Sequence, residues 1–267
     1  MTLRTLELAP AIKLAWKRIK GFKITAWMSA ALMMFIPILF MGLPLVFGTS
    51  MIKVSDADKT VGIVTSPSDY PTIELIFMVG CELVGVLAML VLIGNLLMQG
   101  VRNVRHGHAS IVDAITQFTR PVQVSIGFVI FLSCVGVANY GVEQLIEYLS
   151  HNASATLVPW VMGVKVILAT ATTLFSVLFV FFPCLIIDKK RGIFAAFRES
   201  FQTSWQFKGR VFALMGFCLL LQYAMLVPLM IWQSQWMLLF AFISNIWFLP
   251  FFLNMYGVIY NQLFHDF

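Results

Sequence analysis

Two charged side chains, Glu82 and Lys165, interrupt long apolar segments and are the residues best placed for chemistry inside a membrane. A charge at mid-bilayer costs from about 3 to more than 10 kcal/mol, so it is normally paired or faces water. Counted along their segments at about 1.5 Å per residue, the two lie within about 3 Å of the same depth. We therefore expect either an ion pair or a shared polar cavity. The alternative is that Lys165 extends toward the membrane surface while Glu82 is protonated or lies near the interface.

Uncharged polar residues also occur within the apolar segments, namely Asn95, Asn139, Ser244, Asn245 and Asn254. Hydrogen bonds between membrane helices, worth about 0.6 kcal/mol each, would account for them. A ligand pathway is the alternative. Asn95 and Asn245 are its candidates, and Asn245 falls at a position in its segment similar to those of Glu82 and Lys165.

The sequence offers no set of residues typical of an enzyme or of a metal site. His106 and His108 flank Gly107 in a basic link, where a metal would need further ligands that are not near in sequence. The cysteines lie inside apolar runs without metal-ligand spacing, which favours small buried side chains over disulfides. We find no nucleophile motif and no glycine-rich phosphate loop, so we expect a non-enzymatic protein without cofactor or metal.

The composition points to a membrane protein of a single domain spanning residues 1–267. Hydrophobic residues make up 60% of the chain and charged residues only 11%, whereas about a quarter of a soluble globule is charged. An apolar run of about 20 residues is long enough to cross a bilayer as a helix. We therefore predict an all-α fold with six spans, at 24–47, 73–99, 122–142, 158–187, 211–231 and 237–263.

The positive charges predict the orientation of these spans. Residues 1–23, the 101–121 link and the 188–210 link carry fifteen of the eighteen Lys and Arg residues. Such segments stay on the cytoplasmic side, so both termini should be cytoplasmic. The same residues adjoin the apolar segments, which fits anionic lipid head groups as partners and not nucleic acid.

Two of the basic segments have the pattern of amphipathic helices on a membrane surface. In 188–212, Ile193, Phe197, Phe201 and Trp205 recur at every fourth position, and a similar apolar stripe runs through 1–23. These helices could serve only to fix the topology, or they could bind anionic lipid or a protein partner that the sequence does not identify. The lipid-contacting candidates are Trp16, Lys17, Arg18, Lys189, Lys190, Arg191, Arg198 and Trp205.

A threefold internal repeat is compatible with this order of elements. Each unit, at 1–99, 100–187 and 188–267, would hold one surface helix followed by two spans. Aligning Ala11, Ala109 and Ala196 places Ala15, Asp113 and Ser200 at equivalent positions, and the first and third units match best.

Residues 182–212 and 92–120 resemble the YciC family of bacterial inner-membrane proteins. The resemblance rests on Pro183, Asp188, Lys189, the run Gly192-Ile193-Phe194-Ala195, Arg198, Ser200, the run Thr203-Ser204-Trp205, Val211 and the run Ile93-Gly94-Asn95. Related patterns occur in the membrane domain of some glycerophosphodiester phosphodiesterases. The resemblance covers about a quarter of the chain and implies a multi-pass inner-membrane protein connected with the cell envelope, without catalytic residues.

Together these features predict a scaffold or accessory subunit in envelope or lipid homeostasis. The alternative is a transporter or lipid-handling channel with a polar site at Glu82 and Lys165, which would require a continuous polar path through the spans.

Overall fold

The computed structural model describes residues 8–47, 52–55, 60–63, 72–110, 112, 120–152, 158–232 and 235–264. Helices dominate this part of the chain, as the composition predicted. They are α1 (Leu8–Lys17), α2 (Lys23–Phe47), α3 (Thr72–His106), α5 (Pro121–Asn152), α6 (Val158–Val177), α7 (Phe182–Asp188), α8 (Ile193–Gln206), α9 (Lys208–Trp232) and α10 (Gln235–Phe264).

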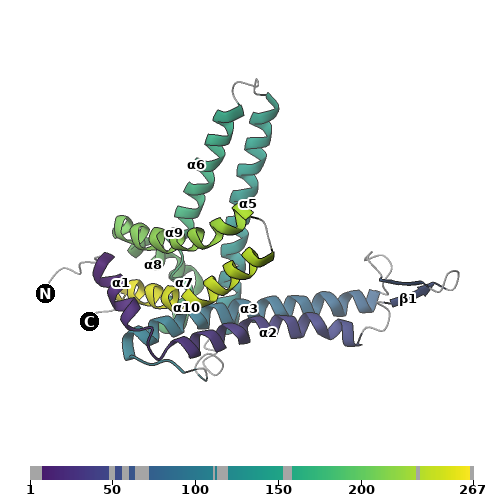
Figure 1. Cartoon of the computed structure of the whole chain (residues 1–267), viewed down its shortest axis with the longest axis horizontal. Helices are drawn as coiled ribbons and strands as arrows, with labels where there is room; N and C mark the ends of the chain where they lie inside the picture. Colours follow the sequence, from purple (N-terminus) through teal and green to yellow (C-terminus); the bar gives the residue numbers. More distant parts are fainter. Residues whose placement is uncertain are drawn as a thin grey trace.

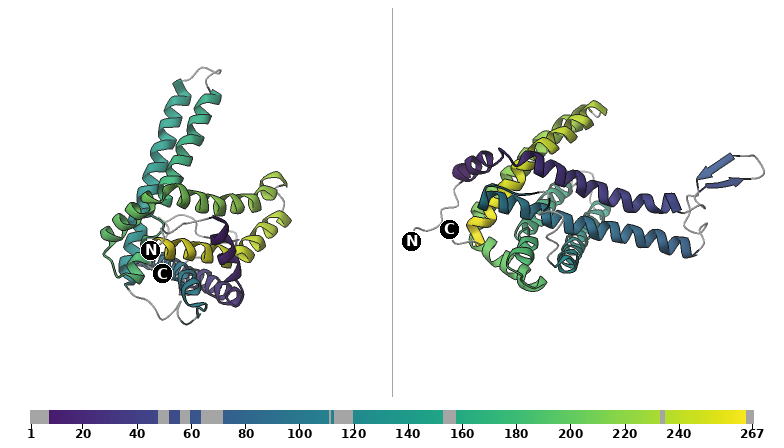
Figure 2. Two further views of the ribbon diagram at one scale, coloured as in Figure 1. Left: turned by 90° about the vertical axis from the view of Figure 1, so that its left-hand side faces the viewer. Right: turned by 90° about the horizontal axis from the view of Figure 1, so that it is seen from below.

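The long helices of the described chain pair into three antiparallel hairpins, α2 with α3, α5 with α6, and α9 with α10. The hairpins leave a common region in different directions, as the views in Figures 1 and 2 show. That region contains α1, α7, α8 and the C-terminal halves of α3 and α10. We call it the basic end, because the basic segments of the sequence converge on it.

Four helical stretches among the described residues are long and apolar enough to cross a membrane: Val79–His106, Pro121–Ser150, Gly163–Asp188 and Leu239–Phe264. They correspond to four of the six predicted spans. The predicted spans 24–47 and 211–231 form α2 and α9, of which the described side chains cover only a part. The chain is therefore a helical membrane protein, and the number six stays a prediction.

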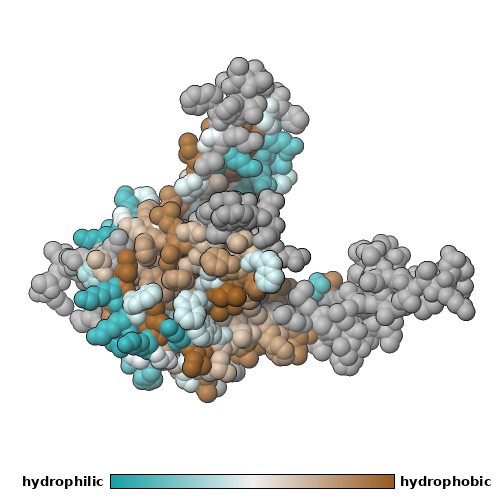
Figure 3. All heavy atoms as spheres, viewed as in Figure 1, coloured by the Kyte–Doolittle hydropathy of each residue, from teal (hydrophilic) through white to brown (hydrophobic). Residues whose placement is uncertain are grey.

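Large apolar side chains remain exposed along the hairpins, as expected where lipid replaces water. Val137 on α5 is 72% exposed, Ile167 on α6 is 68% exposed and Leu220 on α9 is 71% exposed. A soluble monomer rarely leaves so extended an apolar surface uncovered. Figure 3 shows hydrophilic residues gathered at the basic end and again at the far part of the α5–α6 hairpin, with apolar surface between them.

Two segments differ from the expectation. The predicted exposed loop at 48–72 contains two short strands, β1 (Ile52–Ser55) and β2 (Thr60–Ile63), which pair antiparallel with Ile52 opposite Ile63. They lie at the end of the α2–α3 hairpin that is remote from the basic end (Figure 1). The fold is therefore helical apart from this small hairpin.

The predicted span 158–187 is broken into α6 and α7. Leu178, Phe179, Val180 and Phe182 form tighter i→i−3 bonds, including Phe182 N to Phe179 O at 3.1 Å. Pro183 has no N–H to donate to the Phe179 carbonyl, so the preceding residue donates to it instead. The chain turns at this point, and α7 packs against α3 within the basic end.

The core of the basic end is built around the crossing of α3 and α10. A Cβ atom on Gly100 would overlap the Leu253 carbonyl, and one on Gly257 would overlap the backbone of Gly100. The two helix backbones are thus in direct contact, an approach that only glycine permits. Buried aromatic rings, among them Phe181 and Tyr260, fill the space around this crossing.

Candidate functional site

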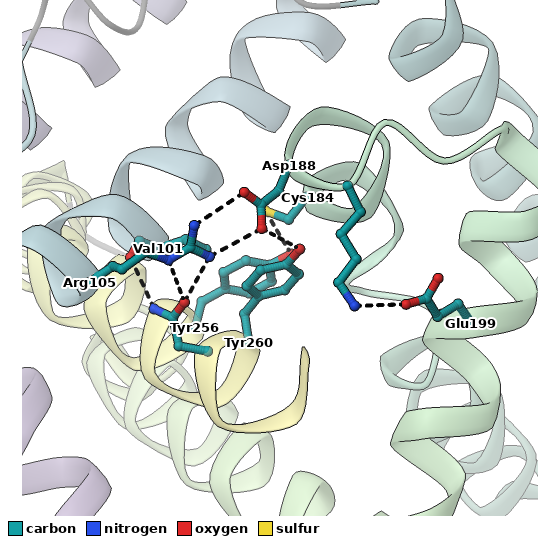
Figure 4. A network of polar contacts seen from close by, with 9 residues as sticks. Val101, Arg105, Cys184, Asp188, Glu199, Tyr256 and Tyr260 are labelled. Atoms are coloured by element: carbon teal, nitrogen blue, oxygen red, sulfur yellow. Dashed lines mark hydrogen bonds and ion pairs between the residues drawn. The ribbon is translucent and has the colours of Figure 1, made fainter. Parts of the chain in front are cut away.

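The polar residues of the basic end converge on one ion pair. Arg105, near the end of α3, donates from Nη1 to Asp188 Oδ1 at 3.2 Å and from Nη2 to Oδ2 at 3.1 Å. Tyr260 Oη donates to the same carboxylate at 3.1 Å. The remaining edge of the guanidinium reaches Asn261 Oδ1 at 3.0 Å, and Asn261 Nδ2 donates to the Val101 carbonyl at 3.0 Å. Figure 4 shows these contacts joining α3, α7 and α10.

A second set of bonds ties α1 to the same helices. Asn103 Nδ2 donates to Asn254 Oδ1 at 2.8 Å and to the Arg18 carbonyl at 2.9 Å. Asn254 Nδ2 donates to the Ala15 carbonyl at 3.3 Å. Both asparagines are almost completely buried. These side chains satisfy carbonyls at the C-terminal end of α1 that have no partner within that short helix.

We call these residues, Arg105, Asp188, Tyr260, Asn261, Asn103 and Asn254, the polar cluster. The guanidinium and the carboxylate share two parallel hydrogen bonds, a geometry that fixes position as well as charge. Arg105 also donates to Asn261, and Asp188 also accepts from Tyr260. The hydrogen-bonding groups of the ion pair are therefore used in contacts within the protein. The cluster therefore acts as a structural tie between four helices, and its geometry does not resemble that of an open substrate site.

Neighbouring groups follow the same pattern. Tyr256 Oη lies 3.0 Å from the Val180 carbonyl and 3.4 Å from Cys184 Sγ, which bridges α10 to the turn before α7. The four cysteines are all free. Within the described residues, no three side chains from His, Cys, Asp and Glu come together as a metal site would need.

The surface helices pack on the protein through their small side chains. In α1, Ala11 and Ala15 are fully buried, whereas Trp16, a predicted lipid-contacting residue, is 58% exposed. In α8, Ala196 and Ser200 are fully buried. The small side chains face the protein because they allow close approach of the helices, which leaves larger aromatic groups toward the outside.

The aromatic stripe of α8 is shared between protein and surroundings. Phe197 packs on Phe182 with ring centroids 4.5 Å apart, and Phe201 stacks on Phe179 at 5.4 Å. Trp205, at the end of the stripe, is 48% exposed, and Phe194 is 78% exposed. These positions agree with a helix that rests on a membrane surface while it contacts the hairpin ends.

The predicted lipid-contacting cations lie at the basic end. Lys17, Lys190 and Arg198 are exposed, whereas Arg18 is half-buried. Lys189 Nζ and Arg191 Nε bind the two oxygens of Glu199, at 2.9 and 3.0 Å.

The structure does not bring Glu82 and Lys165 together. Both are exposed, on α3 and α6, and these helices belong to hairpins that diverge from the basic end (Figure 1). No ion pair joins them in the described part of the chain. Asn245 donates to the Ala241 carbonyl of its own helix at 2.9 Å, and Asn95 is buried. The described structure thus gives the predicted polar path no geometric support.

Sequence reasoning missed most of the polar cluster. It treated Asn254 as one of several interhelical polar residues and Asp188 as part of a surface helix. A signal was present, because Asn254, Gly257 and Asn261 recur at helical spacing near the C-terminus and mark one polar, closely packed face of α10. The surface helix that the repeat predicts for the unit 100–187, with Asp113, falls mostly on residues outside the described part of the chain.

Comparison with known proteins found no family model that matches the chain, and no curated protein or solved structure that is significantly similar to it. The functional argument therefore rests on the geometry of the basic end.

Proposed function

We propose that this protein is a non-enzymatic integral membrane protein whose basic end rests on the anionic cytoplasmic leaflet, where it serves as a scaffold or accessory subunit in envelope or lipid homeostasis. The observation that carries the proposal is the shared location of α1 and α8. Both helices lie at the same end of the hairpins and present exposed cations together with exposed aromatic side chains.

The electrostatics of a membrane surface support this role. Each Lys or Arg near an anionic leaflet contributes about 1 kcal/mol of attraction. Tryptophan prefers the boundary between hydrocarbon and head groups, and Trp16 and Trp205 are placed beside these cations. Three further features favour a rigid scaffold and not a channel with a moving gate. They are the polar cluster, the α3–α10 crossing and the buried small residues of α1 and α8.

The resemblance to the YciC family supports a bacterial inner membrane and a connection with the cell envelope. In the orientation we propose, six spans cross the membrane, both termini are cytoplasmic and β1–β2 lies outside. The repeat fits this arrangement, because Ala11 and Ala196, aligned in the sequence, are buried alike, as are Ala15 and Ser200.

The proposal is tested by the lipid that accompanies the protein out of a bacterial membrane. Discs excised with a copolymer from cells producing the full chain should be enriched in anionic phospholipid relative to the bulk membrane. A variant in which Lys17, Lys190 and Arg198 are changed to Gln should lose much of that enrichment, because three exposed positive charges are removed. Equal lipid composition around the wild-type protein and in the bulk membrane would contradict the proposal.

A further inference from the structure

A groove opens at the basic end between the C-terminal part of α1, the start of α2 and the middle of α10. Its volume is about 690 Å³, within the usual range of small-molecule sites. Trp16, Lys17, Lys20 and Lys23 line one side, and Trp247 and Phe251 line the other. The groove therefore has a cationic margin and an aromatic wall.

The charge of the groove is positive without local compensation. Its lining contains three lysines and no acidic residue. Among the described residues, no carboxylate forms an ion pair with Lys17, Lys20 or Lys23; the nearby basic pairs use Asp188 and Glu199 elsewhere. Lys23 Nζ lies 4.9 Å from the centre of the Trp247 ring, a cation–π contact that holds the ammonium group at the margin of the groove.

The aromatic wall is fixed where Pro250 interrupts the backbone hydrogen bonds of α10. Pro250 lies inside the helix and has no N–H, so the Ile246 carbonyl lacks its usual helical partner. The indole Nε1 of Trp27 donates to that carbonyl at 2.8 Å and its ring packs against Trp247 at 5.6 Å. Phe251 meets Trp16 edge to face at 5.8 Å.

The residues around the groove are of the types that favour the depth of lipid head groups. Trp16, Trp27 and Trp247 gather around it together with the lysines, and tryptophan and lysine both favour the boundary between hydrocarbon and water. The part of α10 that follows the groove toward the C-terminus is buried in the basic end. Phe242 and Ile243, in the part of α10 that precedes the groove, are exposed and apolar. A ligand in the groove would thus meet ammonium groups at one side and apolar surface at the other.

We propose that this groove binds one anionic glycerophospholipid, with its phosphate among Lys17, Lys20 and Lys23 and an acyl chain against Trp247 and Phe251. The inference rests on the proposed function, because it needs the basic end to lie on the membrane surface. It goes further by naming one site and one class of ligand. Complementary charge selects an anionic lipid, and the aromatic wall selects a lipid over a soluble phosphate.

Native mass spectrometry of the full chain in detergent tests the site with three probes: phosphatidylglycerol, phosphatidylcholine and inorganic phosphate. The wild-type protein should retain phosphatidylglycerol in preference to both. The groove variant K17Q/K20Q/K23Q should bind it about tenfold less tightly or worse. The matched control, K13Q/K190Q/R198Q, loses the same charge from exposed positions outside the groove and should retain the lipid.

A second variant keeps every cation. Trp247→Ala removes the aromatic wall at a 55% exposed position, so it should weaken phosphatidylglycerol binding severalfold without unfolding the protein. Thermal unfolding with and without added lipid gives an independent measurement, because a ligand that binds only the folded state stabilises it. The stabilisation at a given lipid concentration should be smaller in both groove variants than in the wild-type protein, and unchanged in the control.

The possible failures are distinguishable. If the groove variant and the control lose lipid equally, the groove is wrong while the general attraction of the basic end stands. If the wild-type protein retains phosphatidylcholine as well as phosphatidylglycerol, both the groove and the proposed function are wrong. If inorganic phosphate displaces the phospholipid, or Trp247→Ala has no effect, the site is an anion site and not a lipid site.

Discussion

Replacing Asp188 by Asn should destabilise the protein strongly, because it leaves Arg105 without its counter-charge. The side chains of Arg105 and Asp188 are only 21% and 14% exposed. Removing one partner of a buried ion pair typically costs about 3–5 kcal/mol. The partial exposure favours the lower end of this range, and the Tyr260 hydroxyl also loses a charged acceptor, worth about 1 kcal/mol. We therefore expect a loss of about 3–4 kcal/mol in unfolding free energy.

The measurement is an unfolding titration of the full chain in mixed micelles, with helix content and tryptophan fluorescence as readouts. Glu199→Gln is the matched control, since it makes the same carboxylate-to-amide change at the same end of the molecule. Glu199 binds Lys189 and Arg191, of which Arg191 is 55% exposed, so this change should cost less than about 1 kcal/mol.

A double-mutant cycle separates the ion pair from general effects of either substitution. Arg105→Gln combined with Asp188→Asn should cost less than the two single changes added together, because each single change strands the other charge. Additive effects, within about 0.5 kcal/mol, would refute the reasoning that the pair acts as a unit. Equal losses in Asp188→Asn and Glu199→Gln would refute the assignment of the polar cluster as the structural tie.

Two further predictions use the same titration. Gly257→Ala should lower the unfolding free energy by at least about 2 kcal/mol, because its Cβ would overlap the α3 backbone. Gly141→Ala, where a Cβ meets open space, should be neutral or slightly stabilising. Equal effects of the two changes would contradict the direct contact of α3 and α10. Trp27→Phe should lower the unfolding free energy by about 1–3 kcal/mol, because it leaves the Ile246 carbonyl without a donor. This loss should be smaller in the Pro250→Ala background, where residue 250 has a backbone N–H to donate to that carbonyl. The same loss in both backgrounds would contradict the assignment of Trp27 as the donor that replaces the missing N–H of Pro250.

The helices and the convergence of positive charge could be predicted from the sequence because both depend on local composition. A run such as 73–99 is apolar enough to form a membrane helix whatever surrounds it. Extra residues at the helix ends were harder to foresee: α3 continues to His106 and α5 to Asn152. In both cases polar residues extend a helix past the apolar run that predicted it.

The polar cluster could not be derived in the same way, because its pairs are distant in sequence. Asp188 lies 83 residues from Arg105, and Asn254 lies 239 residues from Ala15. The sequence around Asp188 or Asn254 does not indicate the residue with which each of them pairs. The sequence also did not indicate which face of α1 packs on the protein, because the small size of Ala11 and Ala15, and not polarity alone, decides that they are buried.

The orientation of the basic end is the claim on which the other functional inferences depend. It can be measured directly by labelling introduced cysteines in intact bacterial cells with a membrane-impermeant thiol reagent, in a chain whose own four cysteines have been replaced. Ala57→Cys, between β1 and β2, should react with the reagent from outside. Lys190→Cys, at the basic end, should react only after the membrane is permeabilised. Equal labelling of the two positions in intact cells would contradict the account.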